Sequence, residues 1–184
     1  TRVSSSAASD VYKRQQNGDE IKSKTVIIST GASAKYLGLP SEQRLIGGGV
    51  SACAVCDGFF YKNQDVAIVG GGDTAIEEAT YLAKICNNVT MLVRKDHFRA
   101  SKAMQNRLSN YDNIKVLFNH EVMEVMGENV VDGLKIKSNL SNDVSELKIT
   151  GLFLAIGHSP NTDIFKGIVL SLIHISEPTR RLVI

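Results

Sequence analysis

Two cysteines three positions apart, with a carboxylate directly after the second, form the part of the sequence best suited to chemistry. They are Cys53, Cys56 and Asp57. A C-x-x-C pair can close or open a small disulfide ring, and it lowers the pKa of one thiol so that a thiolate can attack another disulfide near neutral pH. Asp57 lies close enough in sequence to pass a proton to or from the leaving sulfur. The pattern predicts these three residues as catalytic. A metal site is the alternative, and the absence of a second cysteine pair argues against it.

A glycine-rich turn follows, between a strand expected at 65–69 and a helix expected at 74–85. Its pattern, G-x-G-x-x-A, is typical of dinucleotide-binding β-turn-α-β units. Gly70 would make the tight turn, Gly72 would let the backbone approach a pyrophosphate, and Ala75 would allow close packing of helix and strand. The positive end of the helix dipole would face the phosphates. A plain packing turn is the alternative, and the strand–helix setting favours a cofactor site.

Basic residues occupy the end of the next expected strand, at 89–93. Arg94, Lys95 and Arg99 stand where an NAD site would carry an acidic residue for the ribose hydroxyls. Their charges suit a 2′-phosphate, which arginine can bind through two parallel hydrogen bonds. The cluster therefore favours NADPH, with a solvated basic loop as the alternative. We expect His97 to be a surface residue and not a catalyst.

Composition limits the function classes. The chain has 184 residues, 22% charged residues and a net charge of +2, which gives no electrostatic case for nucleic acid or an anionic membrane. No apolar run is long enough to span a bilayer, and no signal peptide is visible. Three cysteines are too few for a secreted disulfide framework, and they fit a reducing cytoplasm with one working dithiol. The third, Cys86, is expected in the core or at its boundary.

The expected elements indicate an α/β fold, with a Rossmann-like βαβ unit and a parallel sheet. Main-sheet strands are expected at 25–29, 65–69, 89–93 and 152–156, and a second helix at 102–109. Shorter strands at 114–118, 122–126, 130–137 and 147–150 would form a small antiparallel insert. Segments 37–40 and 47–49 are expected to be linker.

The two ends differ from the rest of the sequence. Residues 1–15 are small and polar without a helix or strand period, and residues 171–184 depart from the pattern before them. Both resemble translated adapter sequence. We therefore expect foreign tails at 1–15 and 171–184 around a natural fragment of about 16–170. The alternative is a disordered N-terminus and a short C-terminal strand.

Five motifs follow one another in order and at compatible distances. They are T-G-A-S-A-K-Y-L-G-L-P at 30–40, C-A-V-C-D-G-F-F at 53–60, G-G-G-D-T-A-I-E-E-A at 70–79, the cluster Arg94, Lys95 and Arg99, and G-L-F-L-A-I-G-H-S-P-N-T at 151–162. Together they resemble the bacterial-type, low-molecular-weight thioredoxin reductases, and the resemblance covers nearly all of residues 16–170.

The resemblance implies a flavoprotein with two Rossmann-like domains, in which NADPH reduces FAD, the flavin reduces the Cys53–Cys56 disulfide, and the dithiol reduces thioredoxin. It implies that Cys56 faces the flavin, that Cys53 attacks thioredoxin, and that Asp57 is the acid–base residue. The implied cofactor-binding residues are Thr30 and Gly31 toward FAD, then Gly70, Gly72, Asp73, Thr74, Arg94, Lys95 and Arg99 toward NADPH, with Ile156 and Gly157 at a hinge.

On this basis we expect remnants of an FAD-binding domain at 16–36 and 157–170, on either side of an NADPH-binding and redox-dithiol domain at 37–156. The family's N-terminal G-x-G-x-x-G for FAD is missing, so we expect the fragment to hold FAD poorly and to be inactive alone. The resemblance also implies a homodimer for the full-length protein and a cytoplasmic location.

Three alternative functions share parts of this pattern. The flavoprotein component of an alkyl hydroperoxide reductase shares the C-x-x-C-D site, but it looks directed to NADH, with an acidic residue where Arg94 stands. A ferredoxin–NADP reductase of this fold would lack the dithiol. An NADPH-binding module without turnover is the third. Lys95 is a mild departure from the family, since it keeps the charge of the more usual arginine and loses its bidentate geometry.

Overall fold

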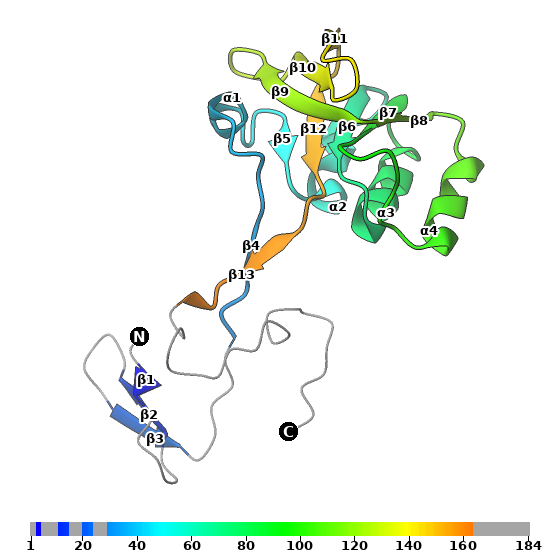
Figure 1. Ribbon diagram of the computed structural model, residues 1–184. Helices are drawn as coiled ribbons and strands as arrows, with labels where there is room; N and C mark the ends of the chain where they lie inside the picture. The colour runs from blue at the N-terminus through cyan, green and yellow to red at the C-terminus, as the bar shows by residue number, and fades with distance from the viewer. Residues whose placement is uncertain (1–2, 5–10, 15–19, 24–28, 164–184) are drawn as a thin grey trace. The chain divides into compact units, whose positions relative to one another are not determined.

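The computed structural model describes residues 3–4, 11–14, 20–23 and 29–163, which belong to two units (Figure 1). The larger unit spans Lys35–Gly157. The smaller unit joins the described residues up to Ala34 with those from His158 onward. The domain expected at 37–156 lies inside the limits of the larger unit.

A five-stranded parallel sheet is the centre of the larger unit, in the order β5-β12-β6-β7-β8. Its strands are β5 (Val50–Ser51), β12 (Gly151–Leu154), β6 (Asp65–Val69), β7 (Asn88–Val93) and β8 (Ile114–Phe118). Helix α1 (Pro40–Arg44) precedes β5, and the helices between the strands are α2 (Ala54–Asp57), η1 (Gly58–Tyr61), α3 (Asp73–Leu82), α4 (Lys102–Arg107) and η2 (Leu108–Asn110). The α/β fold with a Rossmann-like βαβ unit is confirmed.

Helices cover one face of this sheet and a second sheet covers the other (Figure 1). The alternation along β6 decides which residue meets which layer. Val66 and Ile68 pack with Ala75 and Ala79 of α3, whereas Ala67 packs with the residues of the second sheet. All of these side chains are fully buried, so the sheet is apolar on both faces, as a parallel sheet between two layers must be.

The second sheet is antiparallel and has the order β11-β10-β9. Its strands are β9 (His120–Met126), β10 (Gly133–Ser138) and β11 (Val144–Leu147). The insert is therefore confirmed, but two expectations about it are wrong. The strand at 114–118 belongs to the parallel sheet, because α4 carries the chain back across the sheet before it begins. The last strand of the insert is β11, which ends at Leu147 instead of running to 150.

The segments expected as linker are partly regular. Helix α1 begins at Pro40, a residue suited to the first turn of a helix, and β5 begins at Val50. The turn before α1 is fixed by Glu42, which is fully buried and accepts hydrogen bonds from the backbone N–H groups of Leu37 and Gly38, both at 2.8 Å. A buried carboxylate with several backbone donors makes this entry segment rigid.

The smaller unit contains two sets of paired strands. In one, β4 (Ala32–Ala34) pairs antiparallel with β13 (His158–Pro160). In the other, β1 (Val3–Ser4), β2 (Val11–Arg14) and β3 (Glu20–Ser23) form an antiparallel sheet. The expected absence of strand structure at 1–15 is wrong for β1 and β2, because their backbones pair in register with each other and β2 pairs with β3. The foreign origin of 1–15 and 171–184 stays a prediction, and the strand expected at 25–29 lies almost entirely outside the described residues.

Candidate active site

The chemistry-bearing residues lie at one edge of the parallel sheet. Because all five strands run in one direction, their carboxyl ends meet at that edge, where α/β proteins bind ligands. Cys53 follows β5, Gly70 follows β6 and Arg94 follows β7. Strands β5 and β6 are separated only by β12, so their ends are about 10 Å apart at the usual strand spacing.

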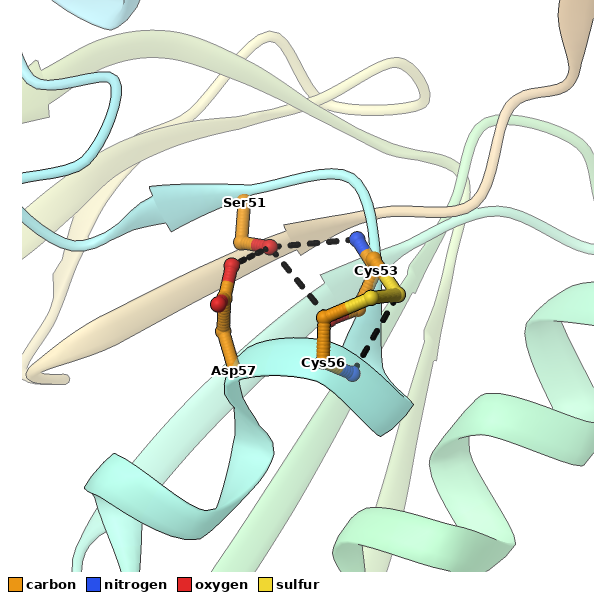
Figure 2. Close-up of a disulfide and its surroundings, with 4 residues drawn as sticks. All are labelled: Ser51, Cys53, Cys56 and Asp57. Atoms are coloured by element: carbon orange, nitrogen blue, oxygen red, sulfur yellow. Dashed lines mark hydrogen bonds between the residues drawn. A yellow bond between two sulfur atoms is a disulfide. The ribbon is translucent and has the colours of Figure 1, made fainter.

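Cys53 and Cys56 form a disulfide at the start of α2 (Figure 2). Cys53 is the N-cap residue of this helix, and its Sγ accepts a hydrogen bond from the backbone N–H of Cys56 at 3.2 Å. The same N–H would stabilise a thiolate on Cys53 once the disulfide is reduced. Cys56 is exposed and Cys53 is half-buried. The predicted redox pair is thus present as a disulfide, with a donor directed at one of its two sulfurs.

Ser51 holds the carboxylate of Asp57 beside the disulfide (Figure 2). Its hydroxyl donates to Oδ2 of Asp57 at 2.6 Å and accepts from the backbone N–H of Cys53 at 3.1 Å. The serine therefore links the carboxylate of Asp57 to Cys53, the N-cap residue of α2. Burial, and then the negative charge of Asp57, raise the pKa of Tyr61, which keeps that phenol protonated. Ser51 could not be predicted from the sequence, because a serine two residues before a cysteine is not a recognisable motif.

Large apolar side chains are exposed around the disulfide. Val55 lies between the two cysteines and is 67% exposed, and Phe59 and Phe60 follow in η1 at 69% and 74% exposure. Three exposed apolar side chains within six residues form a patch of the kind that binds another protein surface. We call Val55, Phe59 and Phe60 the apolar patch.

The glycine turn leaves room for a phosphate group. Gly72 is the N-cap of α3, no side chain caps the helix, and a Cβ built on Gly72 would meet no atom within 4 Å. A Cβ on Gly70, in contrast, would lie 2.5 Å from the carbonyl oxygen of Ala155, and the φ of Gly70 is +150°. Gly70 is thus required by the turn itself, while the uncapped N–H groups of α3 face open space next to Gly72.

The basic loop after β7 is fastened to this turn by its backbone. The carbonyl of Gly71 accepts hydrogen bonds from the N–H groups of Arg99 and Ala100, at 2.7 and 3.1 Å. The carboxylate of Asp73 accepts from the N–H of Ser101 at 2.7 Å. Asp73 therefore has a positioning contact that sequence reasoning missed. Its predicted contact with NADPH, and that of Thr74, stay predictions.

A cavity of about 540 Å³ opens beside the turn and the loop. Its lining includes Gly70 together with the basic group Arg94, Lys95, His97 and Arg99. Arg94 is largely exposed, and its Nε lies 3.9 Å from a carboxylate oxygen of Glu121, a weak surface pair. The apolar part of the lining includes Leu37 and Leu39, from a segment that was expected to be linker. Gly70 and the cations thus line one cavity, whereas Gly72 and the residues of α3 are not part of its lining. The contacts of Gly70, Gly72, Arg94, Lys95 and Arg99 with NADPH stay predictions.

The residues expected at FAD and those expected at the hinge lie in different units. Thr30 and Gly31 belong to the smaller unit, and Ile156 and Gly157 to the larger one. Ile156 lines the cavity described above. The assignment of these four residues to cofactor binding stays a prediction.

The described residues also bear on metal binding and on membrane insertion. Nowhere in residues 29–163 do three or more histidine, cysteine, aspartate or glutamate side chains gather as they would around a metal ion. Among the described helices, none has both the length and the apolar character needed to cross a membrane.

Cys86 is the third cysteine and lies in the core, with 6% of its surface exposed. Burial, and then the charge of Asp65, raise the pKa of its thiol to about 11. Since only the thiolate is nucleophilic, we expect Cys86 of the folded chain to react with iodoacetamide at pH 8 roughly 100-fold more slowly than an ordinary exposed thiol. The rate should rise as the pH approaches 11. Mass spectrometry of alkylated peptides measures this, with the denatured chain as control, and equal rates in the folded and denatured chains would contradict it.

Comparisons with known proteins agree with this geometry. The sequence profile described as pyridine nucleotide-disulphide oxidoreductase matches residues 2–175. The thioredoxin reductase of Streptomyces coelicolor is 50% identical over 146 residues, which are 79% of this chain and 45% of that protein. A Pseudomonas fluorescens protein named glucosaminate ammonia-lyase is 51% identical over 146 residues, 77% of this chain and 45% of its own length.

Among solved structures, the thioredoxin reductase of Lactococcus lactis superimposes with a TM-score of 0.84 at 31% identity. The match covers 93% of this chain and 56% of that one. The chain thus spans about half the length of the relatives it matches.

Proposed function

Because the chain belongs to the pyridine nucleotide-disulphide oxidoreductase family, we propose that the protein of which it forms a part is an NADPH-dependent thioredoxin-disulfide reductase. The disulfide at α2, with its acid–base residue fixed by Ser51, carries this proposal. It stands at the same sheet edge as a turn and a basic loop that fit NADPH. We place the reaction in the cytoplasm, and from the family we infer a homodimer.

The dithiol would reduce its substrate by two exchange steps. The Cys53 thiolate attacks the substrate disulfide, one substrate sulfur leaves as a thiolate, and a mixed disulfide forms. The Cys56 sulfur then attacks Cys53, which closes the Cys53–Cys56 disulfide and releases the second substrate sulfur. Two electrons pass to the substrate, and Asp57 exchanges the protons that the sulfurs lose and gain. Cys53 is the attacking sulfur in this proposal because it receives the Cys56 N–H.

A protein disulfide fits this site better than a small one. The apolar patch begins at Val55, between the two cysteines in sequence, and offers contact area that a small disulfide would not use. We therefore propose thioredoxin as the partner that is reduced. FAD, when bound, would carry electrons from the nicotinamide to the disulfide. An ammonia elimination, the reaction in the name of the Pseudomonas relative, transfers no electrons and would leave Cys53–Cys56 without a task.

The cofactor half of the proposal is tested at Arg94. In Arg94→Ala we expect the affinity for NADPH to fall by about 10-fold and the affinity for NADH to stay unchanged, because only NADPH carries the 2′-phosphate. Titration calorimetry of the 184-residue chain with each nucleotide measures both values. Arg107→Ala, which removes a cation of α4 outside the cavity lining, is the matched control. An unchanged ratio in Arg94→Ala would mean that the basic group is a solvated loop.

A further inference from the structure

An acidic side chain lines the cavity that contains the basic group, and the proposed function gives it no role. Glu121, in β9 of the second sheet, lines this cavity together with Arg94, Lys95 and Arg99. One of its carboxylate oxygens, Oε1, lies 3.9 Å from Nε of Arg94. A carboxylate opposes the binding of a phosphate, so its presence among these cations calls for an explanation.

Hydrogen bonds hold the turn before β9 against the basic loop. The backbone N–H of Asn119, in this turn, donates to the carbonyl oxygen of Lys95 at 3.1 Å. Asn139, in the turn after β10, donates its backbone N–H to the carbonyl of Asn119 at 2.7 Å and its side-chain amide to the carbonyl of Arg94 at 3.3 Å. The backbone that carries Arg94 is thus fastened to the backbone that leads into Glu121, so the two side chains are held as neighbours.

Glu121 is the one carboxylate among the described residues that line this cavity. The other acidic residue nearby in sequence is Asp96, in the basic loop itself. Its carboxylate is hydrogen-bonded to the imidazole of His97 and is not part of the lining. Any effect of a negative charge inside the cavity is therefore expected from Glu121.

The two nicotinamide nucleotides differ at the group that this pair would meet. NADPH carries a 2′-phosphate, which a guanidinium attracts and a carboxylate repels, whereas NADH carries a hydroxyl that a carboxylate can accept from. At 3.9 Å the contact between Arg94 and Glu121 is too long for a hydrogen bond, so it does little to orient the guanidinium. Repulsion of the phosphate and competition for Arg94 are then the main effects of Glu121.

We propose that Glu121 is a specificity-determining residue of this cavity, whose carboxylate competes with the 2′-phosphate for Arg94 and so narrows the preference for NADPH over NADH. The proposal rests on the proposed binding of NADPH to the basic group. Its test measures the binding of each nucleotide alone, without flavin, thioredoxin or turnover.

Glu121→Gln is the main variant, because it removes the charge and keeps an acceptor oxygen at the same reach. We expect the affinity for NADPH to rise by about 3- to 10-fold and the affinity for NADH to change by less than about 2-fold. Titration calorimetry of the 184-residue chain with each nucleotide measures both values. The Glu121 side chain is 42% exposed and its ion pair is weak, so the variant should melt at the same temperature as the unchanged chain.

Two results with Glu121→Gln would overturn the proposal. One is an unchanged ratio of the two affinities. The other is a fall in the affinity for NADPH, which would mean that Glu121 orients Arg94 for the phosphate instead of competing with it.

Glu124→Gln is the matched control. It removes the same charge from the same strand, at an exposed residue outside the cavity lining that pairs with Lys135 at 2.9 Å. Both affinities should stay within about 2-fold of those of the unchanged chain. Equal gains for NADPH in the two variants would show that the net charge of the protein is responsible, and would overturn the proposal.

The double variant Arg94→Ala, Glu121→Gln shows whether Glu121 acts at Arg94. Without the arginine, the 2′-phosphate is no longer held beside Glu121, so removing the carboxylate should raise the affinity for NADPH by less than about 2-fold. Lys137 stands opposite Glu121 in the register of β9 and β10 and is another cation on which the carboxylate could act. A gain of full size in the double variant would point to Lys137 and would overturn the proposal.

The same titrations separate this inference from the proposed function. If Arg94→Ala weakens the binding of NADPH while Glu121→Gln leaves the ratio of affinities unchanged, the cofactor half of the proposed function stands and this inference fails. If Arg94→Ala leaves the ratio unchanged, both fail.

Discussion

Cys53→Ser is expected to lose the exchange reaction with thioredoxin by a factor of at least about 1,000, because no sulfur remains to attack the substrate disulfide from the position that receives the Cys56 N–H. Cys56→Ser should behave differently. Cys53 can still attack, but nothing can displace the bound thioredoxin, so a mixed disulfide should accumulate. Non-reducing electrophoresis and mass spectrometry of the pre-reduced variants mixed with oxidised thioredoxin measure both results.

Cys86→Ser is the matched control for this pair of variants. It removes a thiol from the core, at a distance in sequence from the dithiol, and should exchange with thioredoxin as the unchanged chain does. The opposite trapping pattern, with a stable adduct in Cys53→Ser and none in Cys56→Ser, would show that Cys56 is the attacking sulfur. Because Cys56 is more exposed than Cys53, this experiment tests which of the two sulfurs attacks.

Gly72→Ala is expected to weaken NADPH binding by at least about 10-fold without disturbing the fold. The φ and ψ of Gly72 are −94° and −179°, which alanine adopts without strain, and its Cβ would meet no protein atom within 4 Å. The new methyl group would instead occupy the space proposed for the pyrophosphate. Calorimetric titration with NADPH measures the loss, and unchanged binding would show that the phosphates lie elsewhere.

Gly70→Ala provides the contrast within the same turn. Its Cβ would lie 2.5 Å from a backbone oxygen and 2.8 Å from the Cβ of Ala75, at a φ of +150°. Thermal unfolding measured without nucleotide should therefore show a larger loss of stability in Gly70→Ala than in Gly72→Ala. Gly70→Ala should lose about 2–4 kcal/mol of stability, and Gly72→Ala should lose no more than about 1 kcal/mol.

Local patterns in the sequence were enough to predict much of the fold. The strand at 65–69 and the helix that begins next to Gly72 follow from apolar periodicity and turn residues, and both are confirmed. The strand at 114–118 was assigned to the wrong sheet, because its own residues suit either sheet. Its partner is decided by the crossover through α4, which no single segment encodes.

In the site, too, local patterns could be predicted from the sequence and contacts between elements could not. The disulfide between Cys53 and Cys56 could be predicted, because the spacing of two cysteines is itself the signal. The contacts of Ser51 with Asp57 and of Asp73 with Ser101 could not, because each depends on how elements meet in three dimensions. Sequence reasoning therefore identified the reacting groups and missed the groups that hold them in place.

The most direct test of the account is the transfer of electrons from the reduced dithiol to thioredoxin, without NADPH or flavin. The chain is reduced, freed of reductant, and mixed with an equal amount of oxidised thioredoxin, and the thiols of both proteins are then counted by alkylation and mass spectrometry. Since the chain has no tryptophan, a change in tryptophan emission would come from thioredoxin alone. We predict that thioredoxin gains two thiols while Cys53 and Cys56 lose theirs. Thioredoxin that stays oxidised beside a reduced dithiol would contradict the account.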